Sequence, residues 1–180
     1  MIALQPFNKT GYARLISWVT SAEMLMQFAG PDLPFPLSQE QLDRSVADTN
    51  RIACTAWYIP DQQPIGHAEI YLPEAGTARL CRILIGDTAY RGQGLGLSLV
   101  LALLDLAFSR PGMEIVTLNV FDWNLPAIKC YENAGFNINK DQALTRHING
   151  QAWTVLCMSL HQETQETIQK NTGMAYQPQS

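Results

Sequence analysis

"RILIGDTAYRGQGLGLS", residues 82–98, joins an apolar strand to an apolar helix through a turn that contains three glycines. Its apolar start is typical of a strand, and the apolar stretch over residues 94–109 predicts a buried helix. Gly92, Gly94 and Gly96 can adopt positive φ and leave main-chain amides accessible. Because the first amides of a helix have no partner inside it, the turn is suited to bind a small anion such as a phosphate. A plain glycine-rich turn explains the same residues.

The segments around this turn predict a mixed α/β fold. β-rich runs predict strands over residues 51–59, 64–72, 78–86, 114–121 and 152–160. Helical spacing and capping signals predict helices over residues 11–28, with a break near Thr20 and Ser21, from Ser38 onward, over 94–109 and over 125–135. The first three strands are expected to be antiparallel neighbours, which predicts a twisted, mostly antiparallel sheet with helices on both faces. We expect one domain over residues 1–160 and a polar tail over residues 161–180.

Composition and charge exclude several classes of function. The chain has 180 residues and a net charge of −4, whereas nucleic-acid binding needs clustered Lys and Arg, so we expect no nucleic-acid partner. The longest apolar run, residues 95–108, is shorter than the ~20 residues of a membrane span. With no signal peptide at the start, a cytoplasmic protein without membrane contact is expected. The four cysteines are far apart and form no C-x-x-C pair, which predicts reduced thiols and no metal site.

Two common phosphate-binding motifs fit the glycine turn poorly. A P-loop needs Gly-Lys-Ser or Gly-Lys-Thr after the glycines, and this chain has Leu97 where the lysine belongs. A dinucleotide-binding turn needs G-x-G-x-x-G, and the third glycine comes one position early. Asp122 could imitate the ribose-binding acid of that fold, but it lies further along the chain than the usual ~20 residues.

A third motif pair fits better. "RGQGLG" has the form R-x-x-G-x-G, and "NVFDWNLPAIKCYENAGF" contains N-x-x-A-x-x-x-Y-x-x-x-G-F through Asn124, Ala127, Tyr131, Gly135 and Phe136. This order resembles the GCN5-related N-acetyltransferases, over residues from about 50 to 160. The sequence around the turn, "ILIGDTAYRGQGLG", resembles the branch of this family that includes ribosomal-protein alanine acetyltransferases.

The resemblance implies acetyl-CoA as co-substrate, bound between two central parallel strands that splay apart. Its pantetheine arm would pair with the main chain of the first strand, its pyrophosphate would contact the amides of the turn, and Asn124 and Ala127 would lie against it. The implied cofactor-binding residues are Ile83, Leu84, Ile85, Arg91, Gly92, Gln93, Gly94, Leu95, Gly96, Asn124, Ala127 and Tyr131.

The resemblance also implies catalytic roles. Tyr131 would donate a proton to the departing thiolate, since a phenol with a pKa of ~10 stays protonated at neutral pH. A tyrosine on the core side of a helix, and an Asn124 that only caps that helix, are the structural alternatives. Glu69 is the candidate general base, because alternation in "HAEIY" places His67, Glu69 and Tyr71 on one strand face. A solvated strand face explains the same pattern.

The acceptor is expected to enter against the early helices. Candidate acceptor-binding residues are Trp18, Phe28, Asp32 and Phe35, although core packing explains Trp18 and Phe28 equally well. The predicted reaction transfers acetyl from acetyl-CoA to a primary amine on a peptide terminus, an amino acid or a small molecule, in a monomer or homodimer. The alternatives are a non-catalytic acyl-CoA-sensing module and a nucleotide-binding oxidoreductase domain.

Overall fold

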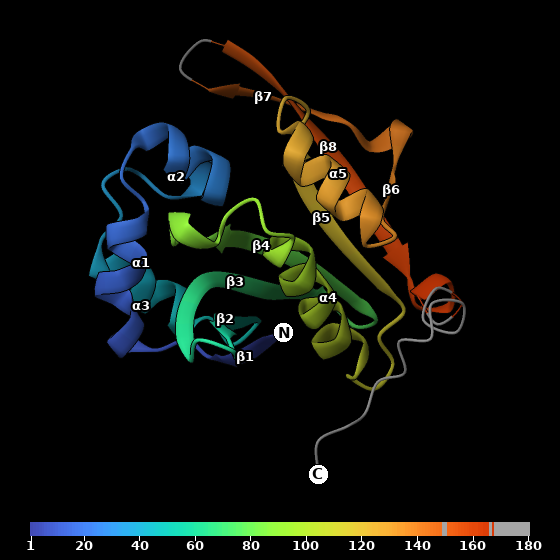
Figure 1. Ribbon diagram of the computed structural model, residues 1–180. Helices are drawn as coiled ribbons and strands as arrows, with labels where there is room; N and C mark the ends of the chain where they lie inside the picture. Colours follow the sequence, from blue (N-terminus) through green and yellow to red (C-terminus); the bar gives the residue numbers. More distant parts are fainter. Residues whose placement is uncertain (149–150, 166, 168–180) are drawn as a thin grey trace.

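A computed structural model describes residues 1–148, 151–165 and 167, and its centre is an eight-stranded sheet (Figure 1). The strands are β1 (Ile2–Pro6), β2 (Arg51–Tyr58), β3 (Gln63–Glu74), β4 (Thr77–Ile85), β5 (Ile115–Phe121), β6 (Asn137–Ile138), β7 (Leu144–Ile148) and β8 (Gln151–His161). The helices are α1 (Tyr12–Trp18), α2 (Ala22–Ala29), α3 (Gln39–Ala47), α4 (Leu95–Phe108) and α5 (Leu125–Asn133), with short 3₁₀ turns between them.

The sheet has the order β1-β2-β3-β4-β5-β8-β6, and β7 pairs with the outer part of β8. Every described pairing is antiparallel except that of β4 with β5. The predicted mixed α/β fold with one central parallel pair is therefore confirmed. Within the described residues, no helix is long and apolar enough to cross a membrane.

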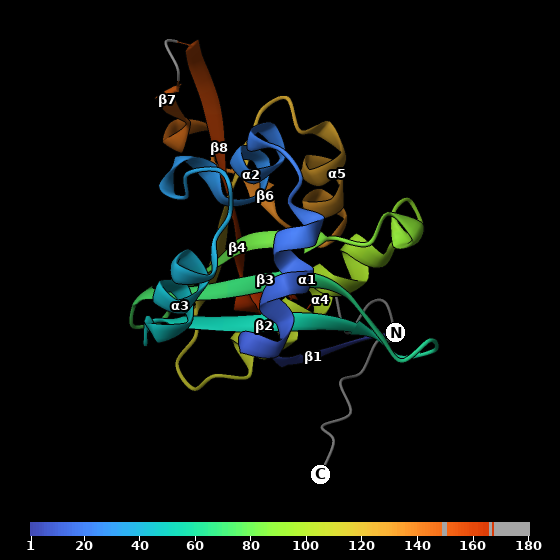
Figure 2. The ribbon, with the colours of Figure 1, turned by 90° about the vertical axis from the view of Figure 1, so that its left-hand side faces the viewer.

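Helices cover both faces of the sheet. In Figure 2, α1 and α3 lie in front of β2 to β4 and α4 lies behind them. Leu99, Leu103 and Leu104 of α4 are fully buried against Ile70 and Leu118 of the strands, in the larger of two apolar clusters. The smaller cluster lies under α1 to α3. The sheet is thus packed on both sides, as the predicted layers require.

Capping residues fix the ends of the helices near the site. Ser38 and Gln41 form a reciprocal capping box at the start of α3, as predicted. Asn124 caps α5, because its Oδ1 accepts a hydrogen bond from the amide of Ala127 at 3.4 Å. Gly94 precedes α4 with a φ of 76°, a left-handed conformation that suits glycine.

The parallel pair separates part-way along its length. Pairing runs only from Thr77 with Ile115 to Leu80 with Leu118, although β4 continues for five more residues to Ile85. A bulge lies in the same part of β4, where the register with β3 shifts and Arg82 has a φ of 51°. The strands therefore splay after Leu80, as the motif resemblance implied.

The structure adds elements that local patterns did not reveal. The sheet includes β1, β6 and β7, which lie outside the predicted strands. The predicted helix over residues 11–28 is two helices, separated where the sequence indicated a break. β8 continues to His161, and Gln165 is buried with its Nε2 donating to Asp105 at 3.5 Å, so the first residues of the predicted tail pack on the domain. The remainder, 166 and 168–180, lies outside the described residues.

Candidate active site

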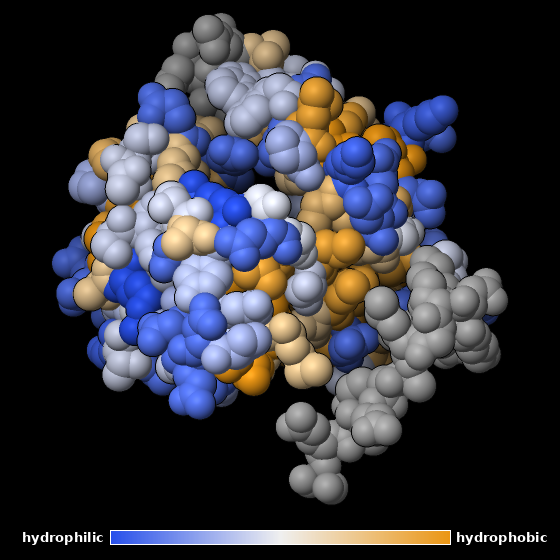
Figure 3. Space-filling view, viewed as in Figure 1, coloured by the Kyte–Doolittle hydropathy of each residue, from blue (hydrophilic) through white to orange (hydrophobic). Residues whose placement is uncertain are grey.

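A cleft of about 1070 Å³ opens where β4 and β5 separate. Its walls come from α2, from β4, from the glycine turn and from α5. Figure 3 shows it as a hollow between α2 and α5, with apolar side chains gathered beside it. A cavity of this size can hold a large cofactor and a small acceptor together.

The glycine turn forms one end of the cleft. Gly92, Gly94 and Gly96 all line it, and the first two have φ angles of 74° and 76°. A Cβ atom built at either of those two would meet nothing within 4 Å, so open space lies beside this main chain. The first amides of α4 begin here without partners inside the helix. These residues therefore fit a bound pyrophosphate, as the sequence predicted.

The side chains of Arg91 and Gln93 fold back onto the turn itself. The Arg91 guanidinium donates to the carbonyls of Ile85 and Gly86, at 2.8 and 3.1 Å. Gln93 donates to the carbonyl of Ala89 at 2.6 Å. Arg91 lines the cleft, whereas Gln93 is not among its described lining residues. Arg91 thus ties the turn to the end of β4 and leaves its positive charge beside the glycines.

Most residues predicted to bind the pantetheine arm line the cleft. Ile83, Leu84 and Ile85 line the cleft from β4, while Asn124 and Ala127 line it from α5. Like Gln93, Leu95 is not among the described lining residues, and its side chain is buried in the main apolar core. Only the main chain of Leu95 is available to the predicted site.

Tyr131 faces the cleft from the second turn of α5. Its ring packs edge-on against Phe136, with centroids 6.2 Å apart. Burial raises the pKa of the Tyr131 hydroxyl well above 10.0, and the nearby thiols of Cys130 and Cys81 raise it further. The hydroxyl therefore keeps its proton over the whole physiological range. It can act as a hydrogen-bond donor or a general acid, but not as a base.

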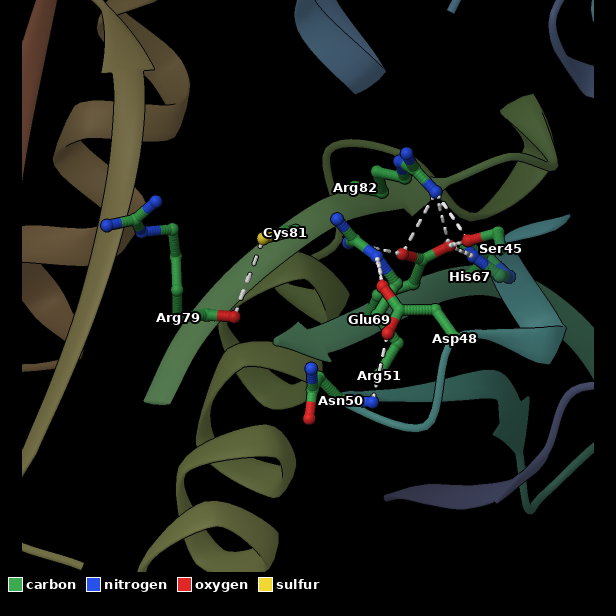
Figure 4. Close-up of polar contacts among 9 residues, drawn as sticks. All are labelled: Ser45, Asp48, Asn50, Arg51, His67, Glu69, Arg79, Cys81 and Arg82. Atoms are coloured by element: carbon green, nitrogen blue, oxygen red, sulfur yellow. Dashed lines mark hydrogen bonds and ion pairs between the residues drawn. The ribbon is translucent and has the colours of Figure 1, made fainter. Parts of the chain in front are cut away.

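Glu69 lies in a buried ionic cluster rather than on a solvated strand face (Figure 4). Its side chain is 1% exposed, which makes the solvated-face alternative wrong. Arg82 of β4 donates to both carboxylate oxygens, at 2.9 and 3.0 Å, and Arg51 of β2 donates at 3.0 Å. Ser45 of α3 donates at 2.9 Å, and His67 Nε2 lies 3.4 Å from Oε1.

This cluster sets the protonation of Glu69. Burial alone raises its pKa, but the hydrogen bond with His67 and the charge of Arg82 outweigh burial and bring the pKa to about 2. A carboxylate held at that value, with donors on both oxygens, accepts a further proton poorly. The general-base role of Glu69 stays a prediction, and these surroundings weigh against it. Glu69 is also absent from the described lining of the cleft.

The four candidate acceptor residues separate into two pairs. Phe28 and Asp32 line the cleft from α2 and the turn that follows it. Trp18 instead packs on the main chain of Gly86, where any side chain would collide with its ring. Phe35 is 45% exposed and lies outside the described lining. Only the first pair is placed where an acceptor could contact it.

Several cleft residues were missed at the sequence level. Arg51, Tyr71, Arg79, Cys81 and Arg82 line the cleft on the side of α3. Two arginines within an otherwise apolar strand, "ARLCRILI", were the available signal. Their convergence with Arg51 depends on strand pairing, which the local pattern does not specify.

Comparison with known proteins agrees with this geometry. A model of the Acetyltransferase (GNAT) family matches residues 18–136, which include the glycine turn, the splayed strands and α5. The chain belongs to the GNAT acetyltransferase family. It is accordingly an N-acetyltransferase that uses acetyl-CoA as co-substrate.

Two similar proteins have names that refer to aminoglycoside acetylation or to kanamycin resistance. An aminoglycoside N(6')-acetyltransferase type 1 from Klebsiella pneumoniae is 25% identical over 159 residues, covering 75% of this chain and 73% of that protein. A kanamycin resistance protein from Rhizobium radiobacter is 40% identical over 52 residues, 29% of this chain and 48% of that protein.

Solved GNAT structures share the fold. An aminoglycoside acetyltransferase in complex with coenzyme A and kanamycin has a TM-score of 0.72 at 24% identity, covering 93% of this chain and 98% of that one. A spermidine N-acetyltransferase from Vibrio cholerae, in complex with CoA and spermine, has a TM-score of 0.76 at 19% identity, covering 92% and 98%. Family membership removes the oxidoreductase alternative, and it leaves the branch of ribosomal-protein alanine acetyltransferases without support among these neighbours.

Proposed function

We propose that this GNAT enzyme transfers the acetyl group from acetyl-CoA directly to a primary amine, within the cleft between β4 and β5. The observation that carries the proposal is the early end of the parallel pairing at Leu80 and Leu118. It opens a cleft that has the glycine turn at one end and Tyr131 on its wall.

The chain supplies three groups of contacts to acetyl-CoA. Beyond Leu80 the edge of β4 that faced β5 has no strand beside it, so main-chain groups of Ile83 to Ile85 on that edge can pair with the pantetheine arm, although the carbonyl of Ile85 already accepts from Arg91. Amides of residues 91–96 and the charge of Arg91 receive the pyrophosphate. Asn124 and Ala127 close the opposite wall.

The reaction needs little more than positioning and one proton donor. The amine nitrogen forms a bond to the thioester carbonyl carbon, and a main-chain amide at the bulge of β4 stabilises the negative oxygen. As the carbon–sulfur bond breaks, the thiolate takes the proton of the Tyr131 hydroxyl. The proton lost by the amine goes to water, from which Tyr131 regains its own. This scheme needs no side-chain base, in agreement with the ion-paired state of Glu69.

The acceptor comes from the side of α2 and α3. Phe28 and Asp32 supply part of that wall. The relatives act on aminoglycosides, and one solved neighbour on spermidine, so amines on small molecules are the first candidates. A peptide terminus, which the ribosomal-protein branch would imply, is the second.

Thiol release with a panel of primary amines tests the proposal. Purified protein and acetyl-CoA should release CoA thiol faster with at least one amine than without any. Acetyl-CoA binding is measured by calorimetry in parallel. Tight binding without amine-dependent release for any member of a broad panel would contradict the transfer function.

A further inference from the structure

We propose that the acceptor amine also carries a carboxylate, and that Arg79 binds this carboxylate at the α3 side of the cleft. This inference rests on the proposed transfer function and specifies its substrate class. It starts from the charges around the cleft. The described lining contains six basic residues, Arg51, Arg79, Arg82, Arg91, Lys129 and Arg146, and Asp32 is its one acid.

Two of these arginines are already neutralised. Arg82 pairs with Glu69, and Arg51 pairs with both Glu69 and Asp48, the latter at 3.0 Å. Arg51 also lies over the ring of Tyr71, 4.7 Å from its centroid. Two arginines and two carboxylates balance, so this buried cluster is a fixed and nearly neutral wall.

Arg79 is different, because nothing in the described part of the chain neutralises it. Its Nε atom is buried and has no hydrogen-bond partner among the described residues. Figure 4 shows its side chain extending from β4 toward β5, away from Glu69. The side chain also lines the cleft, and a guanidinium without a counter-charge at that place favours a negatively charged ligand beside it. The planar fork of an arginine matches a carboxylate, which can accept two parallel hydrogen bonds.

The position of Arg79 places that carboxylate close to the reaction. Arg79 pairs with Thr117 of β5, one residue before the strands separate. Cys81 follows two residues later on the same strand face, and Arg79, Cys81 and Tyr131 all line the cleft. One short molecule can therefore reach both Arg79 and the carbon that the amine attacks.

The same charges disfavour a polycationic acceptor. Kanamycin and spermine, bound by the solved neighbours, carry several ammonium groups at neutral pH. Here such groups would approach an unpaired arginine with only Asp32 to receive them. Like charges at short range in a partly desolvated cleft repel strongly. The acceptor class is thus an amino acid or a similar amino carboxylate.

Matched acceptors test this inference with the full chain and acetyl-CoA. The panel contains γ-aminobutyrate and its amide, an α-amino acid and its amide, spermidine and kanamycin. We expect kcat/KM for a carboxylate member to exceed that of its amide about 10- to 100-fold, the worth of one charge-assisted bidentate contact. Spermidine and kanamycin should be poorer still. Higher kcat/KM for the amides or the polycations would overturn the inference.

Variants of Arg79 separate recognition from folding. Arg79→Gln should raise KM for the carboxylate acceptor about 10- to 100-fold and leave KM for the amide and for acetyl-CoA unchanged. Arg79→Lys should retain part of the preference, since it keeps the charge and loses the fork. Arg110→Gln, outside the described cleft lining, is the matched control. Equal loss for acid and amide would contradict the proposal.

If no amine releases thiol, the transfer function is refuted, but the carboxylate site is not yet tested. Calorimetry of γ-aminobutyrate with the CoA complex then tests that site separately. Binding to wild type that is lost in Arg79→Gln supports a carboxylate site. Equal binding to both proteins, or no binding to either, overturns it.

Discussion

Tyr131 and Glu69 are both buried, yet their pKa values shift in opposite directions because only Glu69 has charged partners. Burial without a charged partner raises the pKa of Tyr131 and keeps its hydroxyl protonated. Burial also raises the pKa of Glu69, but the hydrogen bond with His67 and the charge and hydrogen bond of Arg82 outweigh it and lower that pKa to about 2. One residue is therefore suited to donate a proton, and the other to hold a fixed negative charge.

Replacing Tyr131 by phenylalanine should remove the proton donor with almost no change in volume. We expect kcat to fall about 10²- to 10⁴-fold, and KM for acetyl-CoA to change much less, because the hydroxyl acts mainly in the transition state. Steady-state kinetics with the best amine measures both. Tyr12→Phe, a buried tyrosine whose hydroxyl contacts Asp43 rather than the cleft, is the control. Near wild-type turnover of Tyr131→Phe, where chemistry limits the rate, would make Tyr131 a packing residue.

Replacing Glu69 by glutamine should destabilise the fold. The change leaves Arg82 buried without its balancing charge and Arg51 with Asp48 alone, which costs about 3–5 kcal/mol for ion pairs of this kind. The folded pKa of about 2 lies below the ordinary 4.5, so ionised Glu69 stabilises the wild type above about pH 4.5 and loses this effect as pH falls toward 2. Denaturant unfolding from pH 7 to pH 3 should show the gap between the two proteins narrowing. A gap independent of pH would contradict this assignment.

The pH–rate profile of the same variant tests Glu69 as general base. If Glu69 accepts the proton of the amine, Glu69→Gln should lose rate at neutral pH and recover it near the pKa of the amine. The ion-paired cluster leads us to expect an unchanged profile for whatever fraction folds. If Glu69→Gln loses rate at neutral pH and recovers it only at high pH, Glu69 is the general base.

At the scale of elements, the turn and the bulge around β4 build the site. Gly94 allows α4 to start with its amides toward the cleft, and the positive φ of Arg82 bends β4 away from β5. Arg91 then ties the turn to the carbonyl groups at the end of β4. The turn at Gly94 and the bulge at Arg82 are both local features. The cleft forms because the bulge lies in β4 and the turn lies between β4 and α4.

Replacing Gly94 by valine should abolish CoA binding. The branched side chain would enter the open space beside the turn and would resist a φ of 76°. Gly112→Val is a matched control, because Gly112 has a φ of 75° and equally open surroundings but does not belong to the described cleft lining. Calorimetry should show loss of CoA binding only for Gly94→Val, with a similar loss of stability in both variants. A Gly94→Val protein that folds and binds CoA as tightly as wild type would place the pyrophosphate elsewhere.

At the scale of the whole molecule, the cleft lies between two parts of one sheet. β1 to β4 lie on one side of it and β5 to β8 with α5 on the other, while α4 packs in one apolar core with strands from both sides. Only four residue pairs join β4 to β5, so a ligand that contacts both strands adds to the connection between the two parts.

Coenzyme A should therefore stabilise the protein measurably. At 100 times its Kd, a ligand that binds only the folded state adds about 2.7 kcal/mol, which raises Tm by about 5–10 °C for a domain of this size. NAD at the same concentration should leave Tm unchanged, because the third dinucleotide glycine is missing. Differential scanning fluorimetry compares the two. Equal stabilisation by NAD would contradict the assigned cofactor selectivity.

The sequence by itself determined what a few neighbouring residues can specify. The capping box at Ser38, the glycine turn and the Asn124 to Phe136 motif act through φ/ψ preferences and short hydrogen bonds. The turn and the motif resemble those of the GNAT family, and that resemblance implied the central parallel pair and acetyl-CoA. The short strands β6 and β7 gave little local signal, because pairing with β8 rather than their own residues makes them strands.

Only the tertiary structure decided the environment of the cleft. Glu69 meets Ser45, Arg51 and Arg82, which lie 24, 18 and 13 positions away in the sequence, on three different elements. Alternation placed Glu69 on a face of β3 but could not tell whether α3 would cover that face or which charges would meet there. Burial and ion pairing depend on distances in space, and those depend on strand register and on the bulge at Arg82. For this reason the proposed role of Arg79 emerged only from the fold, whereas the residues proposed to bind acetyl-CoA were predicted from their motifs.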